Sequence, residues 1–140
     1  MVSVKATELY NEVIMELNYA YGNVFIFKGF IVSEINGGVS LSWDLHAKKM
    51  VEDVANYLET NGENLIYISN RINSYSVKAT DWLKFFKLGF NLKAYFIVSN
   101  TPSGKLNIMI ENLFFNNKIQ HFSSIYDAVN HAKTFDYENA

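Results

Sequence analysis

The sequence predicts an α/β fold built on a SpoIIAA-like mixed β-sheet: an N-terminal antiparallel hairpin, then parallel strand–helix units, flanked by about four helices. Three observations predict it. Short apolar runs rich in β-branched and aromatic residues alternate with segments of helical periodicity. The apolar runs at residues 23–27 and 30–35 are separated by only two residues, which is typical of a β-hairpin. The chain has 140 residues, of which 49% are hydrophobic and 19% charged, so it can bury the core of one domain spanning residues 1–140.

The hairpin is expected over residues 23–35. Runs 23–27 and 30–35 are rich in β-branched and aromatic residues, and Lys28-Gly29 between them is a short turn. Residues 1–21 form an N-terminal extension for which the sequence allows two interpretations. The spacing of its apolar residues fits a helix, whereas residues 13–17 fit a strand equally well.

Helices and strands alternate after the hairpin. Ser42 caps the first helix, which Asn61-Gly62 ends, and the second helix runs from about residue 77 to residue 86. Thr101 and Pro102 start the third helix, and Ser123 or Ser124 caps the last. The apolar stripe of the third helix is Leu106, Met109, Ile110 and Leu113, and the inward face of the last is Ile125, Ala128, Val129 and Ala132. Residues 65–68, 94–98 and 118–122 supply the intervening strands.

Composition narrows the classes of function. A net charge of -2 argues against non-specific nucleic-acid binding, which needs clustered Lys and Arg. The absence of cysteine excludes disulfides and thiolate metal sites. The three histidines lie on three predicted elements without metal-ligand spacing, and no nucleotide or dinucleotide fingerprint is present, so no metal or cofactor is expected. No apolar run approaches a membrane span and the N-terminus does not resemble a signal peptide, so a cytoplasmic location is expected.

Polar side chains gather in the loop after the strand at residues 65–68. Ligands of open α/β sheets bind beyond the carboxyl ends of parallel strands, near helix N-termini. This loop is the first candidate for binding an anion or a partner, through Asn70, Arg71, Asn73, Ser74, Tyr75 and Ser76. The alternative is a polar turn whose side chains cap local backbone groups.

Secondary candidates are fewer. Ser103 and Lys105 stand at a predicted helix start and resemble a weak phosphate cradle, although ordinary capping is the favoured interpretation. Glu34 is the only carboxylate in the hairpin strands; a solvent-facing position is favoured over a buried acid of raised pKa. No catalytic residues are assigned. The only pairing available to an enzyme is Glu34 with His46 or His121.

Aromatic residues are numerous for a chain of this length: 11 Phe, 9 Tyr and 2 Trp. Core packing accounts for most of them. The surplus points either to a lipid-like pocket or to an oligomer interface, and a homodimer is the favoured use.

Several phrases of the sequence resemble the STAS superfamily of anti-sigma-factor antagonists, in particular bacterial members of its small STAS/SEC14-like branch. The resemblance covers roughly residues 22–135 and rests on residues 32–39, 67–76, 110–115 and 122–129. It implies a SpoIIAA-like fold and regulation through protein contacts rather than catalysis. In antagonist members, a motif Asp-Ser-Ser-Gly-Leu opens the helix after the central strand, and its second serine is phosphorylated. By this resemblance Ser74 matches the first serine, whereas Asn73 replaces the aspartate and Tyr75 stands at the phosphorylated position.

The function expected first is a non-enzymatic regulatory or protein-interaction module acting through residues 69–77 at a helix N-terminus. Its partner is another protein or a second copy of the chain. The alternative is a binder of a hydrophobic small molecule or lipid.

Overall fold

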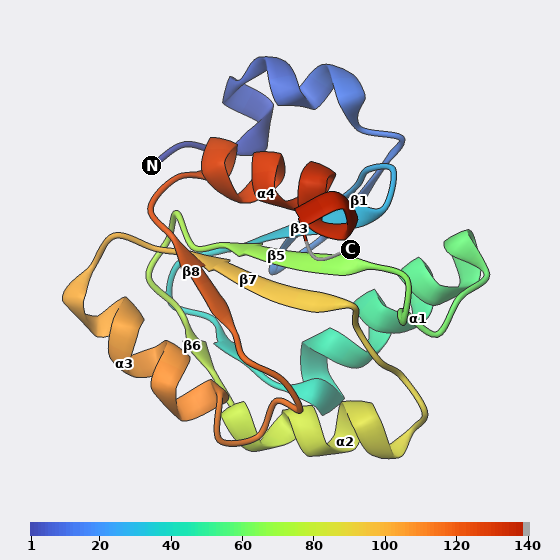
Figure 1. Ribbon diagram of the computed structural model, residues 1–140. Helices are drawn as coiled ribbons and strands as arrows, with labels where there is room; N and C mark the ends of the chain where they lie inside the picture. The colour runs from blue at the N-terminus through green and yellow to red at the C-terminus, as the bar shows by residue number, and fades with distance from the viewer. Residues whose placement is uncertain (139–140) are drawn as a thin grey trace.

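The computed structural model describes residues 1–138, with side chains described for residues 1–135. Its main sheet has six strands in the order β1-β2-β3-β5-β7-β8 (Figure 1). The strands are Met15–Tyr19 (β1), Gly22–Ile26 (β2), Phe30–Ile35 (β3), Ile66–Asn70 (β5), Ala94–Val98 (β7) and Gln120–Phe122 (β8). β1, β2 and β3 pair antiparallel, whereas β3, β5, β7 and β8 pair parallel. The α/β class with an antiparallel hairpin and a parallel continuation is therefore confirmed.

The predicted hairpin is β2 and β3. Gly29 has φ +86°, a left-handed conformation that glycine adopts without steric cost, which explains the tight turn after Lys28. The N-terminal extension adds β1 to the edge of this hairpin. Two 3-10 helices precede β1, η1 (Val4–Ala6) and η2 (Glu8–Glu12), so the strand interpretation is right from Met15 onward.

Within residues 1–138, four α-helices flank the sheet: Lys48–Leu58 (α1), Trp82–Lys87 (α2), Pro102–Glu111 (α3) and Ile125–Glu138 (α4). The predicted caps are present, because Ser42 Oγ accepts from the Leu45 amide and Thr101 Oγ1 accepts from the Gly104 amide. Trp43–Ala47 (η3) winds as a π-helix before α1. α1 ends at Leu58, before the predicted stop, where Glu59 adopts a left-handed conformation with φ 53°.

The second predicted helix starts later than expected. Ser76–Val77 (β6) pairs parallel with Ser40–Leu41 (β4) in a separate two-stranded sheet. Ala79–Asp81 (η4) then leads into α2. The sequence pattern does not predict this short strand, because a run of two residues is too short to show the alternation of a strand.

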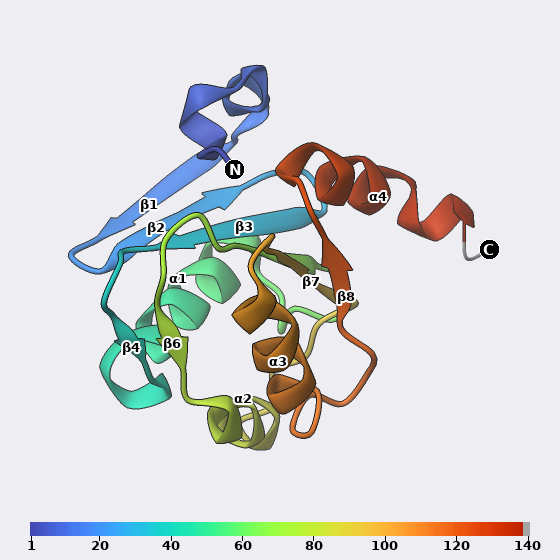
Figure 2. The ribbon, with the colours of Figure 1, turned by 90° about the vertical axis from the view of Figure 1, so that its left-hand side faces the viewer.

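Helices cover both faces of the main sheet (Figure 2). α4 and the N-terminal segment pack on one face, where Val4, Phe96 and Val129 belong to one buried cluster. α1, α2 and α3 lie on the other face (Figures 1 and 2). α4 buries Ile125, Ala128 and Val129 as predicted.

The third helix departs from expectation. Its apolar stripe is exposed rather than packed on the sheet: Leu106 is 57%, Met109 67%, Ile110 43% and Leu113 76% exposed. α3 instead turns Gly104 and Glu111 inward.

Within residues 1–138, no helix combines the length and the apolar character needed to cross a lipid bilayer.

Candidate functional site

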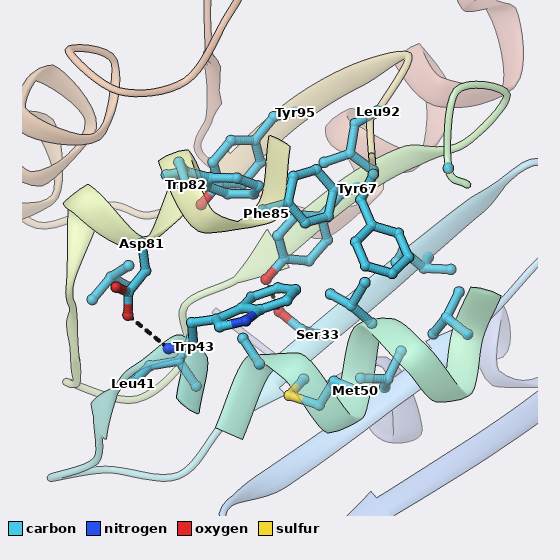
Figure 3. A pocket seen from close by; sticks show the side chains of 18 of the residues that line it. Ser33, Leu41, Trp43, Met50, Tyr67, Asp81, Trp82, Phe85, Leu92 and Tyr95 are labelled. Atoms are coloured by element: carbon cyan, nitrogen blue, oxygen red, sulfur yellow. Dashed lines mark hydrogen bonds between the residues drawn. The ribbon is translucent and has the colours of Figure 1, made fainter. Parts of the chain in front are cut away.

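A cavity of about 130 Å³ lies between helices α1 and α2 and the face of the sheet that they cover (Figure 3). Most of the side chains that line it are aromatic or aliphatic, among them Trp43, Met50, Val54, Trp82, Phe85 and Phe90. Polar side chains line it as well, among them Ser33, Tyr67, Arg71, Tyr75 and Glu111. This combination is typical of small-molecule sites, where apolar walls give affinity and a few polar groups fix orientation.

The register of the parallel strands places the tyrosines of the cavity. Tyr67 of β5 is opposite Tyr95 of β7, and their rings stack with centroids 5.0 Å apart and an interplanar angle of 6°. Side chains two residues apart on a strand share a face, so Ser69 follows Tyr67 on this side of the sheet. Ser33 of β3 completes the group, with its hydroxyl 2.7 Å from that of Tyr67.

The helical side of the cavity is fixed by contacts between elements distant in sequence. The Trp43 amide donates to the Asp81 carboxylate at 2.6 Å, which joins the start of η3 to the start of α2 (Figure 3). The Trp82 ring packs edge-on against Phe85 at 5.2 Å and against Phe115 at 4.9 Å. These contacts hold the aromatic wall against the sheet.

A buried ion pair borders the cavity. Arg71 Nη2 donates to Glu111 Oε2, and the two side chains are only 8% and 2% exposed. Glu111 Oε1 accepts from Tyr95 at 2.8 Å and from Trp82 Nε1 at 3.1 Å. Three donors therefore satisfy the carboxylate, which is what a charge away from water requires.

Burial and charge set the protonation states here. Burial alone would lower the pKa of Arg71, but its interactions with Tyr95, Tyr75 and Glu111 outweigh that effect and raise the pKa well above its usual value. Burial raises the pKa of Tyr67 and of Tyr95 as well, and the Glu111 charge adds to the effect at Tyr95. At neutral pH the arginine is therefore charged and both phenols keep their protons.

The residues of the predicted loop site are divided among several environments. Arg71 is committed to Glu111, and its Nε also donates to Ser69 at 3.1 Å, so it is not presented to an anion in solvent. Tyr75 lines the cavity, and its hydroxyl lies 2.8 Å from that of Ser69. Ser74 and Ser76 are exposed. The expectation that the loop opens a helix is wrong, because Ser76 belongs to β6.

Asn70 and Asn73 are used structurally. Asn73 is exposed but donates from Nδ2 to the Ile35 carbonyl at 3.1 Å, which fastens the loop to the end of β3. Asn70 points to the opposite face of the sheet, where its Nδ2 donates to the Val2 carbonyl and to Glu34. The six residues thus do not form one binding surface.

Glu34 is buried, not solvent-facing as favoured from the sequence; it is 5% exposed. Its carboxylate accepts from the Val4 amide at 2.8 Å and from the Ser3 hydroxyl at 2.6 Å, in addition to Asn70. These bonds dock η1 on the face of the sheet that α4 covers. The strand pattern alone does not predict the burial of Glu34, because the N-terminal segment covers a position that would otherwise face solvent.

The remaining candidates do not converge with the cavity. Ser103 and Lys105 are exposed at the start of α3, and the Ser103 hydroxyl lies 3.2 Å from Thr101 Oγ1. His46 packs against Tyr21, and His121 contacts the Ser99 carbonyl, so neither shares a described contact with Glu34. Among the described residues, no group of three or more His, Asp and Glu side chains is placed to hold a metal ion.

Sequence reasoning missed most of the residues that form the cavity. Glu111 had one usable signal: it is the acidic residue inside an otherwise uncharged apolar run, and Arg71 is the only arginine. Ser33 and Tyr67 had none, since their pairing depends on which strands become neighbours.

The structure is an α/β fold with a largely apolar cavity between the main sheet and helices α1 and α2. No family model matches the sequence, and searches of the curated proteins and of the solved structures found no match.

Proposed function

We propose that the protein binds a small apolar molecule in the cavity between the sheet and helices α1 and α2. The observation that carries this proposal is the cavity of about 130 Å³ with largely aromatic and aliphatic walls. An engineered cavity of roughly 150 Å³ takes up benzene, so a space of this size is large enough for one aromatic ring. The proposal corresponds to the second of the two functions expected from the sequence.

Energetics supports the same proposal. Atoms that line a vacant apolar space lack contacts that a bound molecule would supply. A ligand that fills the space restores those contacts. It therefore stabilises the folded chain by mass action, and the midpoint of thermal unfolding rises with ligand concentration.

Toluene is a suitable probe, and a cavity-filling variant tests the location. Ala55 of α1 lines the cavity, so Ala55→Leu removes space without adding a polar group. We expect toluene to raise the unfolding midpoint of the wild type and of Ala20→Leu, which adds the same atoms at an exposed turn. The rise should be lost in Ala55→Leu. Equal rises in all three proteins, or none in the wild type, would contradict the proposal.

A second candidate is a protein-interaction module, as first expected from the sequence. The observation that favours it is the exposed apolar stripe formed by Leu106, Met109 and Ile110 of α3 and by Leu113 just after its end. A space of about 80 Å³ lined by Ser76, Asn107 and Ile110 separates this helix from β6, so the stripe adjoins the predicted loop. We propose a second copy of the chain as the occupant, because Lys105 is the only exposed charged residue of α3 and two such faces can meet with little charge to desolvate.

A further inference from the structure

The Ser33 and Tyr67 hydroxyls form an isolated pair on the wall of the cavity. They lie 2.7 Å apart, and either oxygen can be the donor (Figure 3). Among the described residues, neither hydroxyl has another hydrogen-bond partner. Ser33 is 1% exposed, whereas Tyr67 is half-buried and lines the cavity, so the open side of the pair faces that space.

Counting hydrogens shows what the pair lacks. Two hydroxyls carry two hydrogens, and one bond between them uses one. The second hydrogen has no protein acceptor, although a donor left unsatisfied in an apolar space costs about 1–3 kcal/mol. The arrangement is explained if the cavity receives an acceptor from outside.

The charges around the cavity determine what kind of acceptor fits. Arg71 and Glu111 neutralise one another, and Glu111 has no unused oxygen. Asp81 accepts from the Trp43 amide and lies 3.7 Å from Lys84. The fourth charged residue of the lining, Lys78, is exposed, so a charged ligand inside the cavity would find only a solvent-screened counter-charge to offset its desolvation.

Size gives the last constraint. A space of about 130 Å³ holds a single six-membered ring with little more than one substituent. Aromatic side chains, among them Trp43, Trp82 and Phe85, offer ring faces and edges to such a ligand.

From these observations we infer that the ligand is an uncharged, ring-sized molecule with one oxygen, a hydroxyl or a carbonyl, which accepts a hydrogen bond from the Ser33–Tyr67 pair. The inference rests on the proposed function and specifies its ligand class. The pair also keeps an oxygen lone pair free, so a ligand hydroxyl can donate in return.

The test compares phenol with toluene, which have the same size and shape, in the wild type and in Ser33→Ala/Tyr67→Phe. Removing both hydroxyls together leaves apolar groups of similar shape and no unpaired partner, so the variant is expected to fold. Tyr57→Phe is the matched control, because Tyr57 is 44% exposed on α1 and does not line the cavity. Calorimetric titration gives the affinities.

We expect the double variant to bind phenol about threefold to tenfold more weakly than the wild type, with toluene unchanged. Tyr57→Phe should change neither, and benzoate, which carries a charge, should bind more weakly than phenol to the wild type. Equal changes for phenol and toluene in the double variant, or benzoate bound as tightly as phenol, would overturn the inference while leaving the proposed function standing. If toluene and phenol both fail to bind the wild type, the proposed function itself fails.

Discussion

Glu111 of α3 joins three other parts of the chain beside the cavity. Its carboxylate accepts hydrogen bonds from the loop after β5 through Arg71, from α2 through Trp82 and from β7 through Tyr95. A charged group with so many buried partners is costly to remove on one side only, because the arginine would remain charged without a counter-ion. The residue therefore fixes both the loop and the aromatic wall.

Glu111→Gln is expected to lower the free energy of unfolding by about 3–5 kcal/mol, since it leaves Arg71 as an uncompensated buried charge. Urea denaturation should show a lower midpoint with an unchanged slope. Glu63→Gln, at an exposed position, is the control and should shift the midpoint little. Arg71→Met/Glu111→Leu should be more stable than Glu111→Gln. If Glu111→Gln were as stable as Glu63→Gln, the ion pair would contribute nothing to the free energy of unfolding.

At the scale of elements, the sequence predicted those whose signal is local. Ser42 and Thr101 cap helices through their own side chains, and the turn at Lys28-Gly29 depends on one glycine. The stripe of α3 was recognised as helical, yet its burial was not, because periodicity reports which residues share a face and not what covers that face.

The candidate site depends on contacts that no local pattern encodes. Arg71 and Glu111 are 40 residues apart, and Ser33 and Tyr67 are 34 apart. These pairs form only after β3, β5 and β7 have become neighbours. Polar residues distinguish the loop at residues 69–77 in the sequence. The residues that line the cavity are mostly apolar, and in sequence they look like ordinary core residues.

One contact between elements makes stability depend on pH. Asp53 of α1 accepts from Tyr19 of β1 at 2.6 Å and pairs with Lys49 at 2.9 Å. Burial alone would raise the pKa of Asp53, but the hydrogen bonds from Tyr19 and Lys49 lower it below its usual value near 3.8. A lowered folded-state pKa stabilises the protein above the unfolded pKa, and this contribution disappears as the pH falls through the folded pKa.

Asp53→Asn is therefore expected to destabilise the protein at pH 6 and to lose that effect progressively below about pH 4. Urea denaturation of wild type and variant, repeated between pH 6 and the acid limit of folding, measures the difference. Glu52→Gln makes the same kind of change at the exposed neighbouring position and should leave the wild-type pH profile intact. A wild-type–variant difference that stays constant down to the acid limit would contradict the assignment.

At the scale of the whole molecule, the two faces of the sheet have different roles. The face under α4 is closed by the N-terminal segment, which the buried Glu34 carboxylate holds through Ser3 and Val4. The opposite face is covered by α1 and α2 (Figure 2). The cavity lies between these helices and the sheet. α3 lies at the periphery of this second face, with Glu111 turned inward and its apolar stripe outward.

The exposed apolar stripe of α3 predicts weak self-association. Leu106, Met109, Ile110 and Leu113 lie one or two turns apart and present one apolar stripe. A pairing of two copies through a single short helix buries an area at the low end for protein interfaces, so the dimer should form only at high concentration. Sedimentation equilibrium over a hundredfold range of protein concentration measures it. Leu106→Gln/Met109→Gln should be monomeric throughout, whereas Leu83→Gln, which changes an exposed leucine of α2, should associate as the wild type does. A wild type that is monomeric at every concentration removes the second copy as occupant of the stripe.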